Sequence, residues 1–148
     1  MTVLDDIIVG VREDMAARME RVSLDDLKAR IETIAPALAT VPGIDILVNN
    51  AAIRGEAHFL DMTLAQWRNV TGNILDSAFL CARAVLPHMV KQKYGRIINI
   101  GGVSAHLGSA NRAHVVTAKT GLVGFTRGLA TEFASHGVTV NCIVPGRI

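Results

Sequence analysis

Three short runs of β-branched residues alternate with long stretches of helical pattern, and this alternation limits the possible folds more than any other feature. The runs are 44–48, 97–100 and 138–144, and glycine or proline marks their ends. Strands joined by long helical crossovers run parallel and form right-handed strand–helix–strand units. The sequence therefore predicts an α/β fold with a doubly wound, Rossmann-like parallel sheet.

Two helices are expected between these strands. Thr63 followed by Gln66 is a capping-box signature, so the first should begin there, continue to about residue 93 and bend near Gly72 or Asn73. The second should extend over residues 114–135. It contains three glycines that we expect to permit close packing against a neighbour, namely Gly121, Gly124 and Gly128.

The first 41 residues have a helical pattern. A hydroxyl cap indicates a helix over 23–38, and an apolar stripe favours a helix before it, although 7–11 could instead be a strand. We therefore expect residues 1–148 to form a single partial domain, with an N-terminal helical region (1–41) and an α/β core (42–148).

Composition excludes several classes of protein. Half of the 148 residues are hydrophobic, as suits a sheet that is buried on both faces. The 15 basic and 13 acidic residues are interspersed, so we expect no nucleic-acid partner. Asp5 and Asp6 argue against a signal peptide, and no apolar run reaches about 18 residues. We expect a cytoplasmic protein without a membrane partner.

Four segments carry motifs in a recognisable order. They are residues 45–52 (Asp-Ile-Leu-Val-Asn-Asn-Ala-Ala), Trp67 with 79–89, residues 95–100, and residues 119–146. Together they resemble the short-chain dehydrogenase/reductase family, and in particular members similar to 3-oxoacyl-acyl-carrier-protein reductases. The resemblance covers about residues 42–148, and four motifs at matching spacings are far more specific than one.

The resemblance implies an NAD- or NADP-dependent oxidoreductase that moves a hydride between the nicotinamide and a small-molecule carbonyl or alcohol. In the family, a tyrosine exchanges the proton and a lysine four residues later binds the ribose. A serine positions the substrate oxygen, and an asparagine completes a water relay. Lys119 matches the lysine, so the resemblance implies a catalytic and cofactor-binding role for it. The alternative is a solvated lysine on a helix.

The position of the family tyrosine departs from the pattern. Val115 stands four residues before Lys119, and its side chain has no exchangeable proton. His114 could take over acid–base work, because imidazole titrates near neutrality, although it is rotated by about 100° on the helix. The alternative is a histidine bonded to backbone or solvent. His106 and His114 lack a neighbouring acidic or cysteine ligand, so we expect no metal site.

Two further catalytic positions depart as well. Gly102 occupies the serine position, and Ser104 on the same loop could reach a substrate oxygen or cap a turn. Ile74 occupies the asparagine position. A one-residue helix bulge could bring Asn73 into the site instead, although Asn73 could also face solvent or stabilise a kink.

Residues after two strands are expected to line the cofactor, because ligands bind at the carboxyl ends of strands in open α/β sheets. They are Asn50, Ala51, Ala52, Pro145 and Gly146. The asparagine could equally tie neighbouring loops together. The family's glycine-rich, pyrophosphate-binding turn is absent, and so is the substrate-covering segment. We therefore expect a fragment or a truncated relative.

Two other functions stay open. The chain could be a non-catalytic binding or assembly module, or a lyase or dehydratase that uses Lys119 and His114 without a hydride step. The long helices could form a dimer face, as their family equivalents do, so we expect a homo-oligomer.

Overall fold

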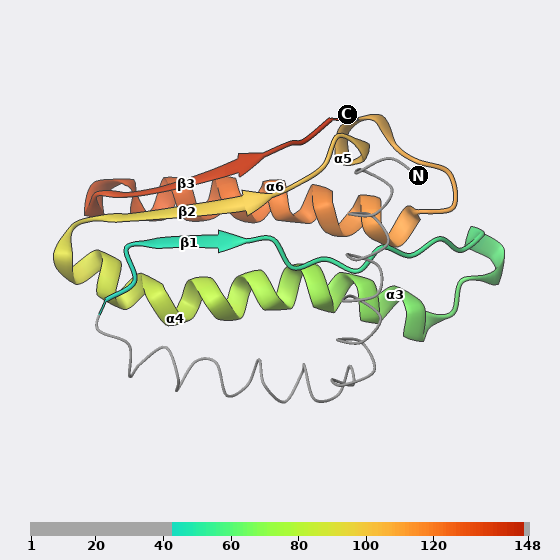
Figure 1. Ribbon diagram of the computed structural model, residues 1–148, viewed down its shortest axis with the longest axis horizontal. Helices are drawn as coiled ribbons and strands as arrows, with labels where there is room; N and C mark the ends of the chain where they lie inside the picture. The colour runs from blue at the N-terminus through green and yellow to red at the C-terminus, as the bar shows by residue number, and fades with distance from the viewer. Residues whose placement is uncertain (1–42, 147–148) are drawn as a thin grey trace, which may run out of the picture. The chain divides into compact units, whose positions relative to one another are not determined.

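The computed structural model describes residues 43–146, so the helical region expected over 1–41 lies outside the described residues. Figure 1 shows the arrangement of the described elements. In chain order they are β1 (Ile46–Asn49), η1 (Phe59–Asp61), α3 (Leu64–Thr71), η2 (Gly72–Asp76), α4 (Ser77–Gln92), β2 (Gly95–Ile100), α5 (Ser104–Leu107), α6 (Ala113–Phe133), η3 (Ala134–His136) and β3 (Val138–Ile143).

The three strands form one parallel sheet in the order β1-β2-β3. Leu47 pairs with Ile97, and Ile97 pairs with Val140 on the other side. The carboxyl ends of the strands therefore meet at one edge, as Figure 1 shows. The expected parallel α/β sheet is confirmed, with each strand within about two residues of its predicted position.

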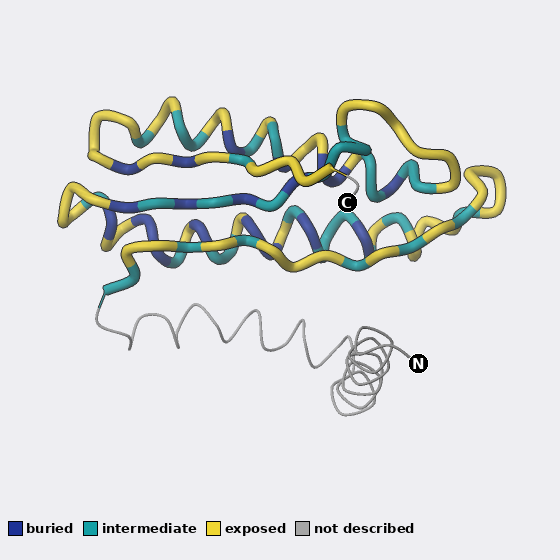
Figure 2. The backbone as a smooth tube through the Cα atoms, turned by 45° about the horizontal axis from the view of Figure 1, so that its top comes forward, coloured by how far each residue is buried: buried dark blue, intermediate teal, exposed yellow. Residues whose placement is uncertain are grey.

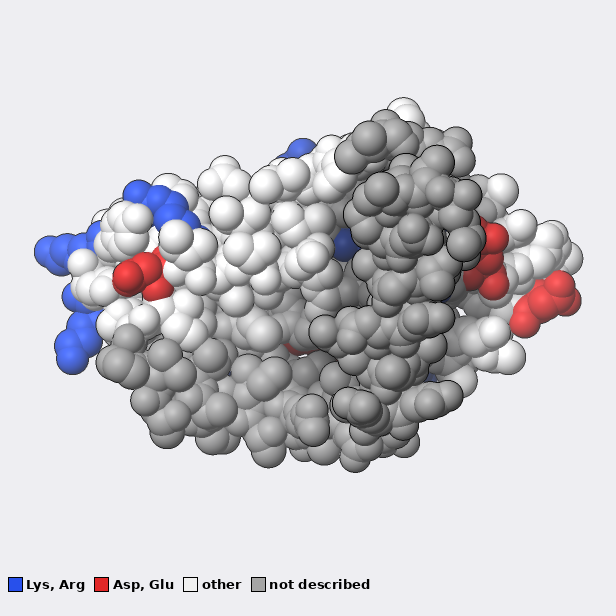
Figure 3. Space-filling model, viewed as in Figure 1, with Lys and Arg blue, Asp and Glu red and all other residues white. Residues whose placement is uncertain are grey.

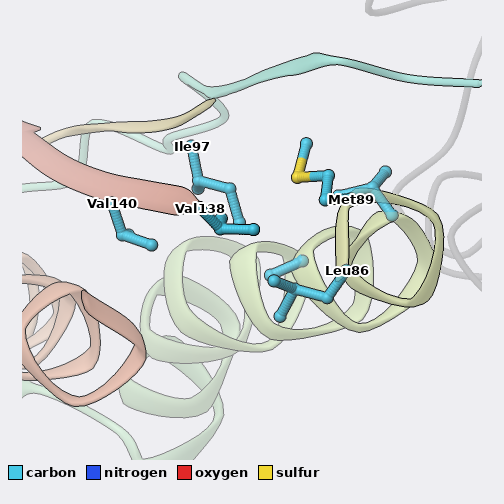
Figure 4. Packing of buried hydrophobic residues seen from close by; sticks show 7 residues of the cluster. Leu86, Met89, Ile97, Val138 and Val140 are labelled. Carbon is cyan, nitrogen blue, oxygen red and sulfur yellow. The ribbon is translucent and has the colours of Figure 1, made fainter. Parts of the chain in front are cut away.

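Helices α4 and α6 cover one face of this sheet. Alternate strand side chains point to this face, and Ile97, Val138 and Val140 are at most 5% exposed there. They pack with Leu86 and Met89 of α4, as Figure 4 shows, and α6 adds apolar residues to the same cluster. Burying these side chains against one another is what stabilises the layers.

The opposite face of the sheet carries apolar side chains that are much less buried. Ile46, Val48 and Ile143 are each more than 50% exposed. Figure 2 shows how the strands differ, since β2 alternates between buried and intermediate residues while β1 alternates between exposed and intermediate ones. Among the described elements, helices therefore cover only one of the two faces.

The first helix starts and changes at the positions that the sequence indicates. The Thr63 hydroxyl accepts a hydrogen bond from the Gln66 amide, and the Gln66 side chain accepts one from the Thr63 amide. A π-helical segment over 72–76 separates α3 from α4, at the predicted bend. Helix α4 ends at Lys93, which has a left-handed backbone (φ 58°).

The second helix, α6, ends within about two residues of its expected end, and a short 3-10 turn, η3, separates it from Gly137 (φ 74°). The expected role of its glycines holds only in part. A Cβ on Gly121 would lie 3.2 Å from Leu75, so this glycine does permit close packing. The prediction is wrong for Gly124 and Gly128, because both lie on an exposed side of the helix with no described atom within 4 Å of a built Cβ.

Basic side chains gather at the end of the described region opposite the carboxyl edge of the sheet. Figure 3 shows them where α4 passes into β2, a segment that contains Lys91, Lys93 and Arg96. Arg96 is anchored there over the Tyr94 ring at 4.3 Å. This basic cluster therefore lies at the amino end of β2, away from the edge where ligands are expected.

Candidate active site

Lys119 is held at the carboxyl edge of the sheet. It lies on α6, is only 8% exposed, and donates a hydrogen bond from Nζ to the carbonyl oxygen of Ile100 at the end of β2. Burial lowers the pKa of Lys119 from its ordinary value, and the nearby thiol of Cys142 has a smaller, opposing effect. The fold therefore presents a largely desolvated amine at the edge where ligands bind.

The loops that follow β2 and β3 are tied to each other beside this amine. The Gly101 amide donates to the Ile143 carbonyl at 2.8 Å, and the Val103 amide donates to the Pro145 carbonyl at 3.1 Å. A Cβ on Gly101 would lie 2.9 Å from Cys142 Sγ, so glycine allows this approach. Pro145, expected to line the cofactor, and the following Gly146 are exposed at this edge.

Ser104 lies close to the position of the missing family serine. Its Oγ is the only described atom within 4 Å of a Cβ built on Gly102, at 3.8 Å. Ser104 is the first residue of α5, and the residue before it, Val103, occupies the N-cap position without a side-chain cap. Both interpretations of Ser104, as a group that reaches a substrate oxygen and as a cap of a turn, therefore stay predictions.

His114 faces a different part of the molecule from Lys119. It is 2% exposed, and its Nε2 lies 3.1 Å from a Cβ built on Gly55, in the loop after β1. Val70 of α3 borders the same position. The Nδ1 atom is buried and has no hydrogen-bond partner among the described residues. The ring thus packs against the β1 loop, whereas the Lys119 amine reaches the end of β2.

The expected helix bulge is present, but it directs an apolar side chain inward. Ile74 within the π-helical segment is 1% exposed and packs with Ala118 and Leu122 of α6. Val115 packs against the same cluster. Asn73 is only partly buried, and its carbonyl oxygen accepts a hydrogen bond from the Ser77 hydroxyl. Both positions where the family has polar residues therefore belong to an apolar cluster.

The residues after β1 are the other expected cofactor contacts. Asn50, Ala51 and Ala52 are exposed where the strand ends. The preceding Asn49 instead ties two strands together, because its Nδ2 donates to Asn99 Oδ1 at 2.8 Å. Asn49 therefore ties the strands together, while Asn50 is exposed at the strand end.

Two anchors that the sequence does not reveal hold the β1 loop against the start of α6. Arg112 donates from Nε and NH2 to the Glu56 carboxylate at 3.0 and 2.7 Å, and the Ala57 amide donates to the Asn111 carbonyl at 2.8 Å. Residues far apart in the chain form these pairs, so no local pattern marks them.

No described helix is long and apolar enough to cross a membrane. No group of three or more potential metal ligands occurs among residues 43–146.

Known proteins with similar sequences match most of the chain. A 3-oxoacyl-acyl-carrier-protein reductase of Synechocystis sp. is 40% identical over 146 residues, which is 99% of this chain and 58% of that protein. Nodulation protein G of Azospirillum brasilense is 41% identical over 84% of this chain and 51% of that protein. The Escherichia coli reductase FabG is 40% identical over 81% of this chain and 50% of its own length.

The chain thus spans about half the length of the curated relatives that it matches. A model of the family described as short chain dehydrogenase matches residues 11–148. The similarity begins well before residue 42, where the recognisable motifs start, so the expected extent was too short. With this match and the parallel sheet, the chain belongs to the short-chain dehydrogenase family.

Proposed function

We propose that this chain forms the catalytic-helix part of an NAD- or NADP-dependent oxidoreductase that acts on a small carbonyl or alcohol substrate. The observation that carries the proposal is the buried Lys119 amine at the carboxyl edge of the sheet. Its place in the sequence matches the family lysine, and two of the relatives above are named as reductases.

The described residues fit the ribose end of a nicotinamide cofactor. An ammonium group has three donors, and Lys119 uses one on Ile100, which leaves donors for ribose hydroxyls. Asn50, Ala51 and Ala52 would line the adenosine side, and Pro145 with Gly146 the nicotinamide side. The bound cofactor would supply or accept the hydride. The chain has no glycine-rich turn for the pyrophosphate, so we expect tight binding only together with one.

The proposed division of work follows from the contacts. Lys119 would stabilise negative charge on the substrate oxygen, and Ser104 would orient that oxygen. Val115 cannot supply a proton. His114 and Asn73 are weaker candidates for this step, because the His114 ring lies against the β1 loop and Ile74 takes the inward position of the bulge.

The substrate class is proposed from the relatives. Two of their names specify a 3-oxoacyl group on an acyl carrier protein. We extend to this chain only the shared chemistry, which is a carbonyl that becomes an alcohol. The expectation of a cytoplasmic location and the division into residues 1–41 and 42–148 stay predictions.

A second candidate is a binding or assembly module without catalysis. The specific observation in its favour is that Ile74 and Val115 sit together in an apolar cluster with Ala118 and Leu122. Such a cluster stabilises the fold and moves no proton. No described contact favours a lyase over these two.

A homo-oligomer is proposed through a groove between α4 and α6. The groove has a volume of about 360 Å³ and is lined mainly by apolar side chains, among them Phe79, Leu86 and Leu129. Arg83 of α4 and Glu132 of α6 border it, and in a two-fold symmetric dimer a contact between Arg83 of one copy and Glu132 of the other would occur twice.

The proposal is tested in a chimera that joins residues 1–148 to the segments of the Synechocystis relative outside the matched region. Lys119→Met should weaken NADPH binding, measured by fluorescence titration, by about tenfold or more. Lys91→Met, which changes an exposed lysine on α4, is the matched control and should bind as the parent does.

Three outcomes separate the candidates. Lys119-dependent binding together with turnover of a 3-oxoacyl thioester supports the oxidoreductase. Lys119-dependent binding without turnover supports the non-catalytic module. Binding that is the same in both lysine variants would overturn the proposed role of Lys119.

A further inference from the structure

A chain of buried hydrogen bonds connects β1, β2 and α6. Asn49 Nδ2 donates to Asn99 Oδ1 at 2.8 Å, and Asn99 Nδ2 donates to Thr126 Oγ1 at 2.8 Å. The Thr126 hydroxyl in turn donates to the Leu122 carbonyl at 2.7 Å. Asn99 is 0% exposed and Thr126 is 6% exposed. A buried amide would be costly without these partners, so the chain is a fixed part of the interior.

Thr126 on the helix determines which group donates and which accepts in each of these hydrogen bonds. Thr126 gives its one hydroxyl proton to its own helix, so toward the sheet it can only accept. Asn99 must therefore present Nδ2 to Thr126, and it presents Oδ1 to Asn49. One amide orientation satisfies all three groups, which makes the contact between helix and strand specific.

The same helix makes a second polar contact with the same strand. Lys119 precedes Thr126 by seven residues, or about two turns, so both side chains lie on the face that meets the sheet. Lys119 binds the carbonyl of Ile100, the residue next to Asn99. Helix α6 is therefore joined to consecutive positions of β2 at two points, and Figure 1 shows it lying along the strands.

Apolar contacts of Ala118, Leu122 and Phe125 also seat helix α6 near these points, but apolar contacts are non-directional, so the two polar contacts are the ones that select a single rotation. Gly121, Gly124 and Gly128 lie between and just beyond the two polar contacts, and they carry no side chain. A Cβ on Gly124 or Gly128 would meet no described atom within 4 Å. Rotation of the helix at Thr126 would carry Lys119 with it, because an α-helix turns as a rigid rod over two turns.

We propose that Asn99 and Thr126 are positioning residues for Lys119, which hold α6 in the rotation that keeps the Lys119 amine against the end of β2. The functional meaning of this arrangement rests on the proposed cofactor role of Lys119. The positioning itself does not, and it can be measured on the 148-residue chain without cofactor or substrate.

The experiment measures acetylation of Lys119 by acetic anhydride as a function of pH, with peptide mass spectrometry as the readout. The rate at high pH reports access to the deprotonated amine, and the midpoint reports the pKa of Lys119. Thr126→Val keeps the side-chain shape and removes the acceptor for Asn99. It should raise the high-pH rate by about tenfold and move the midpoint up toward the ordinary lysine value.

Two variants are matched controls. Thr126→Ser keeps the hydroxyl and should behave as the parent chain. Thr131→Val lies on the same helix and removes a hydroxyl that also donates to a carbonyl four residues earlier, Arg127 at 3.0 Å, but is exposed. It should leave Lys119 unchanged. If Thr126→Val does not fold, Thr126→Ala replaces it, because its smaller side chain leaves room for water beside Asn99.

An unchanged rate and midpoint in the folded Thr126 variant would overturn the positioning role. An equal change in Thr131→Val would do the same, because it would show a general loosening of the helix. Release of Lys119 in Thr126→Val with no dependence of NADPH binding on Lys119 in the chimera would instead refute the proposed function and leave the positioning role intact.

Discussion

The two sides of the candidate site differ in chemistry. On the β2 side, polar groups are buried and paired, with Lys119 on a strand carbonyl and Asn99 on Thr126. On the bulge side, Ile74 and Val115 are apolar where the family has an asparagine and a tyrosine. Under the proposed function, the groups that would hold a ligand are kept, while the positions that would move a proton carry apolar side chains.

The energetics of buried polar groups explain how such a division can be stable. Removing one partner of a buried hydrogen bond is costly, whereas replacing both partners by apolar groups can be nearly neutral. Ile74 and Val115 contribute to one apolar cluster, so each provides an apolar surface for the other. On the β2 side Asn49, Asn99 and Thr126 are joined by hydrogen bonds, so a change that removes one of these polar groups leaves its partner unpaired.

The largest expected effect comes from restoring the proton-moving side. In the chimera, Val115→Tyr with Gly102→Ser should raise reductase turnover by about 10²–10⁴-fold, the usual contribution of a positioned proton donor. Space allows the serine, because only Ser104 Oγ lies within 4 Å of a Cβ on Gly102. Steady-state turnover of a 3-oxoacyl thioester with NADPH is the measurement.

Lys119→Ala in the restored chimera is the control and should abolish the gain. If His114 already supplies the proton, the double change should leave turnover flat while His114→Ala lowers it. That result would mean that His114 moves the proton, so the site would not have lost proton transfer and the contrast between its two sides would disappear.

The second effect is on stability and tests how apolar the bulge side is. Ile74→Asn restores the family residue at a position that is 1% exposed among apolar neighbours. It should lower the free energy of unfolding by about 2–4 kcal/mol, since it removes a buried side chain and buries an amide. Urea unfolding of the chain is the measurement. Ile74→Val should cost about 1 kcal/mol, and equal losses in both variants would argue against a polar penalty.

Sequence patterns predict the fold well here, because each strand and each of the long helices is marked by a local signal, whereas the short helix α5 and the turn η1 were not predicted. The capping box at Thr63 and the bend near Gly72 are both present. The site is predictable only where it follows the motifs, as at Lys119. Counting without a gap already places Ile74 at the asparagine position. Whether a bulge would bring Asn73 there instead could not be predicted, because a bulge shifts the helical phase by an amount that the sequence does not specify.

The polar chain through Asn99 depends on long-range pairing. Asn99 and Thr126 come from different elements, and their contact is set by how α6 docks on β2. The one available signal is that Asn99 stands at a buried position in the apolar strand Ile97–Ile100. Such a residue must have a partner, but the sequence alone does not say which.

A third, smaller effect concerns association through the α4–α6 groove. Phe79→Asp places a charge at its edge and should weaken self-association by about tenfold, as measured by sedimentation. Phe59→Asp is the matched control, because Phe59 is more exposed (67% against 47%) but lies outside the groove. Equal effects of the two changes would show that general surface hydrophobicity drives association.

The smallest expected effect is a pH dependence of the free energy of unfolding, and it comes from Lys119 on the β2 side of the site. Burial lowers the pKa of Lys119 below its ordinary 10.5. Below the folded-state pKa the amine is charged in the folded and in the unfolded chain. The cost of burying the charge then lowers the stability of the folded chain in full. Between that pKa and 10.5 the folded amine releases its proton while the unfolded one keeps it, so stability rises with pH in this window. Lys119→Met removes this dependence, so the stability of the parent relative to that of the variant should increase as pH rises toward 10.5. Urea unfolding at a series of alkaline pH values checks this, with Lys91→Met as a control whose difference from the parent should stay constant. If the difference in free energy of unfolding between Lys119→Met and the parent is equally constant, the amine is solvated. The β2 side of the site would then not hold a buried charged group, and the contrast with the apolar bulge side would fail.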